Sequence, residues 1–154
     1  FLIGVDLAQL KLDKNQINKK MLLLPLVIII SSSLITLFFP LIFKDLGFKE
    51  SLALAQGYGW YSMSPAMMSQ LGNAHLGTLA LIIDLNREIF AILFIQSLGR
   101  IYPNTAIGLG GATSMDATLG IIKESCGLQY IGLAVLTGLV LSCLAPLFIA
   151  LIMG

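Results

Sequence analysis

The sequence predicts an all-α protein, a polytopic membrane helix bundle in which two helices are broken, or discontinuous. Hydrophobic residues make up 57% of the 154 residues and charged residues only 11%, an apolar excess over the near-even content of soluble domains. The mean hydropathy is +0.93. Long apolar stretches alternate with short polar ones, and two of the stretches contain glycine clusters. A formal net charge of +1 gives no reason to expect a nucleic-acid partner.

The first part of the chain differs from the rest. Residues 1–20 are expected to form the end of a preceding helix and then a basic cytoplasmic stretch, because lysines gather just before the first apolar run and basic flanks favour the cytoplasmic side. Residues 21–154 are expected to form a transmembrane transport domain of about five membrane segments, since each span uses roughly 20 residues. The chain opens without an initiator methionine, so we expect it to be half of a larger transporter.

Three apolar segments are long enough to cross a membrane as continuous helices. Met21 to Phe43 is interrupted only by small hydroxyl residues and two prolines. His75 to Leu98 is apolar except at its middle, and Leu128 to Gly154 is apolar throughout most of its length. About 20 apolar residues span the hydrocarbon core of a bilayer. Each segment therefore predicts a membrane-spanning helix.

Two further segments, Ser51 to Leu71 and Asn104 to Ile122, contain glycines that weaken a helix. Their sequences match as G-x-x-S-M in Gly59-Trp-Tyr-Ser-Met-Ser64 and Gly111-Ala-Thr-Ser-Met-Asp116. Paired interruptions are typical of transporter binding sites, because freed backbone groups can coordinate charged ligands. Chance or a glycine packing motif is the alternative. Two crossings separate the breaks, so both are expected to enter from the same side, with any inverted counterpart outside this sequence.

Asp84, Arg87 and Glu88 lie in the middle of the helix predicted over His75 to Leu98. Spacings of three and four residues place them on one helical face. Each charge at the bilayer centre costs about 2.5–3.5 kcal/mol, so this face must pair internally or line a wet cavity. An ion pair between Arg87 and one carboxylate is the simplest explanation. Once Asp116 is counted, at least one acid is left over, and such a carboxylate can bind and release a proton.

The candidate site combines these charges with polar side chains and with the backbone of the two breaks. The residues expected to bind substrate or protons are Asp84, Glu88, Asp116, Arg87, Asn86, Ser62, Ser64, Thr113 and Ser114. The backbone positions expected at the breaks are Gly57, Gly59, Gly108, Gly110 and Gly111. The hydroxyl groups serve equally well to satisfy the local backbone. No catalytic residue, metal ligand or cofactor is expected.

Three spaced motifs resemble a known family. Gly57-Tyr-Gly-Trp-Tyr-Ser62, Asp84 with Asn86-Arg-Glu88, and Leu109-Gly-Gly-Ala-Thr-Ser-Met-Asp116 are similar to the C-terminal half of the LysO lysine exporter family, and the resemblance covers nearly the whole chain. It implies an inner-membrane exporter of L-lysine and toxic lysine analogues in which Asp84 stands at the position of a functional aspartate. A companion aspartate would belong to an N-terminal half, supplied by a second subunit or a severed half.

The function that these features favour is export of L-lysine or a similar cationic amino acid through the inner (plasma) membrane by proton antiport. The expected partners are this substrate, protons, membrane lipid and the second half, and a homo-oligomer is left open. A channel, or a structural subunit whose charges only pair with each other, is the alternative. An enzyme is not expected, because an intramembrane aspartyl protease needs an aspartate directly after GxG, whereas Gly108-Leu-Gly110 is followed by Gly111.

Overall fold

The computed structural model describes residues 22–38 and 46–154, and these residues form helices and connecting turns, with no strand among them. The predictions for residues 1–20 fall outside the described part of the chain. The same holds for residues 39–45, which include the last five residues of the first predicted span. Within the described ranges the prediction of an all-helical protein is confirmed.

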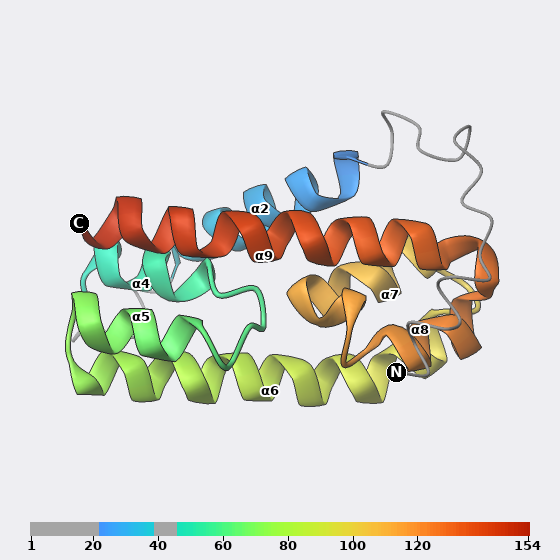
Figure 1. Cartoon of the computed structure of the whole chain (residues 1–154), viewed down its shortest axis with the longest axis horizontal. Helices are drawn as coiled ribbons and strands as arrows, with labels where there is room; N and C mark the ends of the chain where they lie inside the picture. The colour runs from blue at the N-terminus through green and yellow to red at the C-terminus, as the bar shows by residue number, and fades with distance from the viewer. Residues whose placement is uncertain (1–21, 39–45) are drawn as a thin grey trace.

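Two long antiparallel helices frame the molecule (Figure 1). They are α6 (Ala74–Leu98) and α9 (Ile131–Met153), the second preceded by the 3-10 helix η4 (Leu128–Tyr130). Their 25 and 23 residues correspond to lengths of about 38 and 35 Å at 1.5 Å per residue. The side chain of Asn73 caps α6 by accepting the backbone N–H of Leu76 at 2.9 Å. Both helices agree closely with the predicted segments.

The two long helices differ in how apolar their sequences are. In the described part of the chain, length and composition would allow one helix, Leu128–Met153, to cross a membrane. α6 is as long but carries Asp84, Arg87 and Glu88 near its middle. α2 (Leu23–Ile35) is apolar and shorter, with 13 residues.

A first helical hairpin consists of α4 (Phe48–Ala55) and α5 (Ser64–Leu71). Its two open ends lie beside the C-terminal end of α9. At the start of α4, Lys49 Nζ donates a hydrogen bond to the carbonyl oxygen of Met153 at 3.4 Å. Beyond the end of α5, a Cβ atom on Gly72 would lie 3.1 Å from the Met153 side chain. The connecting residues 56–63, here called the first tip, lie near the middle of the molecule (Figure 1).

A second hairpin is formed by α7 (Pro103–Gly110), the 3-10 helix η3 (Gly111–Met115) and α8 (Leu119–Cys126). The Cys126 sulfur lies 4.0 Å from the carbonyl oxygen of Pro103, so the end of α8 returns to the start of α7. Both open ends lie at the C-terminal end of α6, where Gly99 approaches α8. Residues 111–118, the second tip, lie near the middle of the molecule (Figure 1).

The two hairpins enter from opposite ends and meet through a hydrogen bond from the Ala112 N–H to the Tyr58 carbonyl oxygen at 3.0 Å. The expectation that both breaks enter from the same side is therefore wrong. Discontinuous helices are not confirmed either, because each short pair returns to the end at which it began. The chain reverses at residues with left-handed backbone: Tyr58 and Gly59 have φ of 52° and 88°, and Gly111 has φ of 60°.

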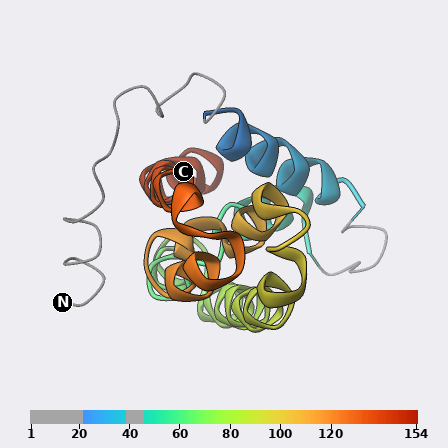
Figure 2. The ribbon, with the colours of Figure 1, turned by 90° about the vertical axis from the view of Figure 1, so that its right-hand side faces the viewer.

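The same order of elements, a hairpin and then a long helix, thus occurs twice in opposite directions. Viewed end-on, the hairpins lie between α6 and α9, and α2 covers one side (Figure 2). One apolar cluster packs the second hairpin between these helices, as at Ile107 and Ile122. Another packs the first hairpin, as at Met68 and Ile149. A third joins α2 to both tips around Tyr58.

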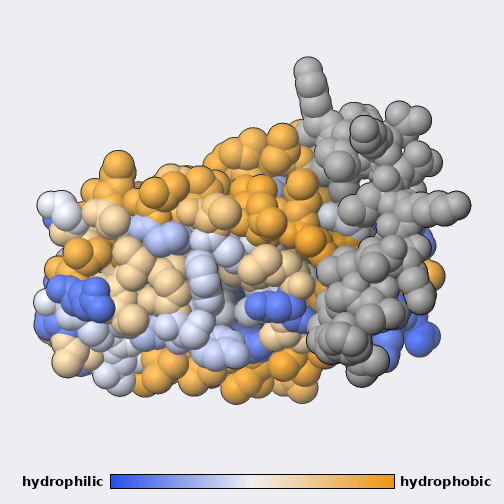
Figure 3. All heavy atoms as spheres, viewed as in Figure 1, coloured by the Kyte–Doolittle hydropathy of each residue, from blue (hydrophilic) through white to orange (hydrophobic). Residues whose placement is uncertain are grey.

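The outer surface is apolar over the long helices (Figure 3). Large apolar side chains are exposed on α2, α6 and α9, among them Ile30, Phe90, Leu93 and Leu147. A more polar band runs between the apolar edges in Figure 3. Exposed apolar surface of this extent is typical of a protein that contacts a membrane or another protein chain.

Candidate functional site

Asp84 lies in the middle of α6 and is only 2% exposed. Its Oδ1 atom accepts a hydrogen bond from the backbone N–H of Gly59 at 3.0 Å, and its Oδ2 atom accepts one from the Ser64 hydroxyl. Both donors belong to the first hairpin. The carboxylate therefore fastens the first tip to the middle of α6, and charge-assisted hydrogen bonds of this kind are stronger than neutral ones.

Gly57 permits this close approach. A Cβ atom at this position would lie 2.6 Å from Oδ2 and 2.8 Å from Oδ1 of Asp84, and 2.9 Å from the Ser64 hydroxyl oxygen. These separations are shorter than van der Waals contact allows. The glycine is therefore required by the buried carboxylate that faces it, which gives the predicted position Gly57 a steric role.

Arg87 follows Asp84 on the same face of α6. Its Nη2 atom donates to the carbonyl oxygen of Gly108 at 3.2 Å. Its Nη1 atom is buried and has no hydrogen-bond partner. Within residues 22–38 and 46–154, the guanidinium forms no ion pair with Asp84 or Glu88, since both oxygens of Asp84 already accept hydrogen bonds from the first hairpin. Asp84 therefore acts on the guanidinium electrostatically without bonding it directly.

Gly59 and Gly111, the first residues of the repeated G-x-x-S-M motif, flank this guanidinium. Both have positive φ. A Cβ atom on Gly111 would lie 2.6 Å from Nη2 of Arg87, and one on Gly59 would lie 3.5 Å from Nη1. Glycine adopts positive φ without steric cost. The motif repeat therefore corresponds to two equivalent turns, one at each tip, that face the same side chain.

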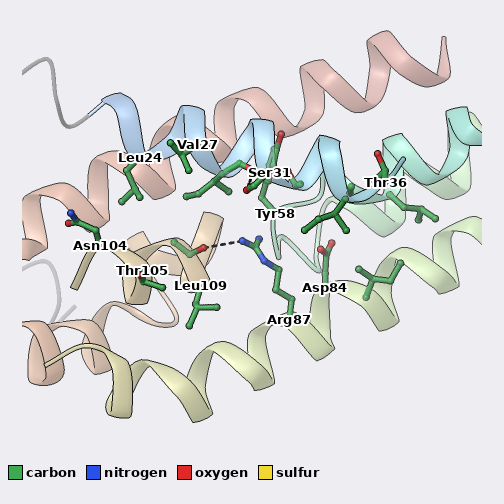
Figure 4. Close-up of a pocket in the computed structure, with 17 residues that line it drawn as sticks. Leu24, Val27, Ser31, Thr36, Tyr58, Asp84, Arg87, Asn104, Thr105 and Leu109 are labelled. Atoms are coloured by element: carbon green, nitrogen blue, oxygen red, sulfur yellow. Dashed lines mark hydrogen bonds between the residues drawn. The ribbon is translucent and has the colours of Figure 1, made fainter. Parts of the chain in front are cut away.

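A cavity of about 510 Å³ lies between α2, the first tip, α6 and α7 (Figure 4). Asp84 and Arg87 reach into it from α6, with the Arg87 guanidinium directed toward Gly108 of α7 (Figure 4). The remaining polar lining consists of Ser31, Ser32, Thr36, Tyr58, Asn104 and Thr105. Small-molecule sites typically occupy about 300–1,000 Å³ with a few polar groups in an apolar wall. An amino acid fits a cavity of this size and composition.

Glu88 and Asp116 lie outside the lining of this cavity. Glu88 is half-buried and Asp116 is exposed, and the two carboxylates interact electrostatically as like charges. The Asp116 side chain accepts the backbone N–H of Ala117 at 2.6 Å. Neighbouring carboxylates can share a proton or bind a cation between them. The structure therefore divides the predicted acids into Asp84 in the cavity and a second pair outside it.

Thr113 and Ser114 act on the backbone of the second tip. The Thr113 hydroxyl donates to the carbonyl oxygen of Gly110 at 2.9 Å. The Ser114 hydroxyl lies 2.7 Å from the carbonyl oxygen of Gly111 and 2.8 Å from that of Ala134 on α9. Neither lines the cavity. These geometries favour the alternative in which hydroxyls at a break satisfy local carbonyls.

Two other predicted residues lie apart from the cavity. Asn86 is exposed, and its amide donates back to the Ile82 carbonyl oxygen at 2.8 Å on α6. Ser62 is exposed at the first tip. Both positions fall on the outside because the adjacent residues of a helix or tight turn point in different directions.

Sequence reasoning missed the contribution of α2 and the buried amide beside it. Ser31, Ser32 and Thr36 line the cavity. Gln56, 2% exposed, accepts the Tyr58 hydroxyl and donates to Ser33 on α2 at 3.3 Å. The available signals were a run of three serines in an apolar segment and a glutamine directly before the glycine cluster.

Buried charges where two opposed helical hairpins meet, beside a mostly apolar cavity, are characteristic of secondary transporters. The comparisons with known proteins agree with this class. The family model described as "Lysine exporter LysO" matches residues 1–153. The chain therefore belongs to the lysine exporter LysO family.

Two curated relatives extend this result. The chain is 37% identical over 152 residues to "Lysine exporter LysO" of Escherichia coli K12, covering 97% of this chain and 50% of that protein. It is 32% identical over 151 residues to "Putative lysine exporter" of Haemophilus influenzae, covering 97% of this chain and 77% of that protein. The chain thus spans half the length of the Escherichia coli relative. No solved structure matches it.

Proposed function

We propose that this chain is the C-terminal half of an exporter that moves L-lysine or a similar cationic amino acid out of the cell. The names of both relatives support lysine as the substrate. The observation that carries the proposal is the buried Asp84 and the half-buried Arg87, whose Nη1 atom is buried, side by side in the lining of one cavity without a direct bond between them. Ionisable residues kept at such depth are usually functional.

The proposed setting is the inner membrane, crossed several times. α2, α6 and α9 would run across it, with their exposed apolar side chains in contact with lipid. α4, α5, α7 and α8 contain eight residues each, or about 12 Å of helix, which is less than half of a hydrocarbon core of about 30 Å. The hairpins would therefore enter from opposite sides and meet near the midplane, taking the place of the discontinuous helices.

A second half or subunit is part of the proposal. The Escherichia coli relative is twice as long as the region matched, and the polar band between α6 and α9 (Figure 3) needs a polar partner or water within a membrane. An N-terminal half would cover this band and supply the companion carboxylate implied by the family resemblance.

The hydrogen bonds that hold Asp84 support the proposal of proton antiport. As a carboxylate it accepts hydrogen bonds from Gly59 and Ser64. A proton would remove the negative charge that strengthens both hydrogen bonds, and on Oδ1 it would face the Gly59 N–H, which is itself a donor, so protonation would weaken the hold of α6 on the first tip. Uptake and release of this proton would thereby couple to movement of the tip.

The like-charge pair outside the cavity completes the proposed ion path. Glu88 and Asp116 repel each other as like charges, so a proton or an ammonium group that binds beside them would relieve their repulsion. The substrate class, a cationic amino acid, matches this requirement.

Replacement of Asp84 by asparagine tests the proposal. The Asp84→Asn variant keeps the size of the side chain but loses the titrating group. The chain, together with the proposed N-terminal half, is reconstituted into proteoliposomes loaded with L-lysine, and lysine efflux and proton influx are recorded together. An acidic outer buffer should accelerate wild-type efflux, because antiport moves protons in as lysine moves out. The variant should lose this acceleration.

The control is Asn86→Ala on the exposed side of the same helix, which should transport like the wild type. Efflux from the Asp84→Asn variant with the wild-type rate and wild-type dependence on the pH gradient would refute the coupling role. Lysine efflux without any proton movement in the wild type would indicate a channel instead.

A further inference from the structure

We infer that Arg87 binds the α-carboxylate of the transported amino acid, so that the cavity selects an amino acid over a diamine of the same length. This inference rests on the proposed function and names how that site reads its substrate. Lysine carries two ammonium groups and one carboxylate. The positively charged Arg87 would recognise the carboxylate.

Arg87 has hydrogen-bond donors that no partner uses. A guanidinium has five N–H donors arranged to match a carboxylate in a bidentate manner. In the described part of the chain, Arg87 makes a single hydrogen bond, from Nη2 to the Gly108 carbonyl oxygen at 3.2 Å. Its Nη1 atom is buried and without a partner. A buried cation in this condition is costly unless an anion joins it.

Asp84 does not hydrogen-bond to the Arg87 guanidinium. Asp84 is the acid that shares the cavity with Arg87. Both of its oxygens are held by donors of the first hairpin, Gly59 and Ser64, and Gly57 packs against them so closely that a Cβ atom would clash. The carboxylate is therefore kept for the first tip and does not turn to Arg87. Asp84 therefore influences Arg87 only through space, and an anion that bonds the guanidinium directly would come from outside the described residues.

The cavity beside the guanidinium has space for a ligand. Arg87 lines the cavity of about 510 Å³, and the two neighbouring backbone turns carry glycine, at Gly59 and Gly111. Because these two glycines carry no side chain, the guanidinium has room to lie between the tips. A carboxylate that enters from the cavity would replace the weak bond to Gly108 with two charge-assisted bonds, releasing α7 from α6 at that point.

The charges of the cavity then match the head group of an amino acid. Arg87 faces the α-carboxylate, and Asp84 is the negative group beside it for the α-ammonium. Hydroxyl oxygens of Ser31, Ser32 and Tyr58 line the wall formed by α2 and the first tip, where a side-chain ammonium finds acceptors. A diamine such as 1,5-diaminopentane has the ammonium groups of lysine but leaves Arg87 without its anion.

Competition in transport measures this selectivity. Proteoliposomes that contain the chain with its proposed N-terminal half exchange radiolabelled L-lysine against unlabelled competitors. Unlabelled L-lysine should compete at least about tenfold better than L-lysinamide or 1,5-diaminopentane, because loss of a charge-assisted hydrogen bond in a buried site costs about that factor or more. Equal competition by all three compounds in the wild type would overturn the inference and leave lysine transport itself established.

Variants of Arg87 provide the second arm. Arg87→Gln should weaken competition by L-lysine about tenfold and leave competition by 1,5-diaminopentane unchanged or stronger, so that the selectivity disappears. Arg87→Lys keeps the charge but not the fork geometry, and should show an intermediate selectivity. Arg100→Gln, at an exposed position two residues beyond the end of α6, is the matched control and should retain the wild-type pattern.

The outcomes separate the two proposals. Loss of affinity for lysine and diamine by the same factor in Arg87→Gln would show a purely structural role and overturn the inference. Wild-type selectivity in that variant would do the same. Absence of any lysine exchange in the wild type would instead refute the proposed function.

Discussion

The two hairpin tips share a plan but differ in chemistry. The first tip holds a charged side chain of α6, through hydrogen bonds from Gly59 and Ser64 to Asp84. The second tip bonds to backbone, as Ser114 does to the carbonyl oxygen of Ala134 on α9 at 2.8 Å. A bond to a carboxylate depends on protonation, whereas a bond to a carbonyl does not. If Asp84 takes up protons as proposed, the bonds of the first tip would respond to pH and those of the second would not.

The largest effect is expected at the first tip from Gly57→Ala. The added Cβ atom would lie 2.6 Å from Oδ2 of Asp84, so the carboxylate has to move away from its donors. Overpacking of this kind costs about 1–3 kcal/mol, and because it displaces the coupling group we expect transport to fall more than folding. Lysine efflux and thermal unfolding of the purified protein measure the two effects.

Gly120→Ala is the matched control for this change, because no atom lies within 4 Å of the position of its added Cβ. It should leave both efflux and thermal stability near the wild-type values. If Gly57→Ala behaved like Gly120→Ala, the proposed close packing of the first tip against Asp84 would be refuted.

A change at the second tip tests the other side of the comparison. A Cβ atom on Gly138 of α9 would lie 2.7 Å from the Met115 backbone nitrogen and 2.8 Å from the Ala112 carbonyl oxygen. Gly138→Ala should therefore lower the free energy of unfolding by about 1–3 kcal/mol. The protein that remains folded should keep its proton coupling, as measured by the ratio of proton to lysine flux. A changed ratio would show that the second tip also takes part in coupling.

The smallest effect is expected from a pair of serines in the first hairpin. Ser64→Ala removes one of the two hydrogen bonds to Asp84 and should cost about 1 kcal/mol or somewhat more, with reduced efflux. Ser62→Ala, at an exposed position two residues earlier, should change stability by less than about 0.5 kcal/mol. Similar losses in both variants, measured by thermal unfolding and efflux, would contradict the assigned roles.

The sequence predicted the helices better than their directions. The lengths of the apolar segments located α6 and α9 within a few residues, because an apolar stretch of more than about 20 residues most often forms one long helix. The glycine clusters were also placed correctly as interruptions. Whether the chain continues or turns back at an interruption depends on the φ values of Tyr58, Gly59 and Gly111, which tertiary contacts set and which composition does not reveal.

The candidate site was predicted in part for a similar reason. Helical spacing placed Asp84, Arg87 and Glu88 on one face; Asp84 and Arg87 both line the cavity, whereas Glu88 does not. It did not show that hydrogen bonds from the first hairpin keep Asp84 apart from Arg87, because those donors lie 20 and 25 positions away along the chain. The cavity wall on α2 was missed because serines in an apolar helix commonly bond to their own backbone, as Ser31 and Ser32 do here, and this pattern does not show that they also line a cavity.

The meeting of two half-length hairpins also has an electrical consequence. In the proposed membrane setting, water can follow each hairpin inward from its own side, so the insulating layer narrows to the contact between Tyr58 and Ala112. The membrane voltage then falls mainly across that short distance. Transfer of one charge through the full voltage is worth about 2.3 kcal/mol per 100 mV. A proton or lysine would collect most of this energy while moving only a few ångströms past Asp84 and Arg87.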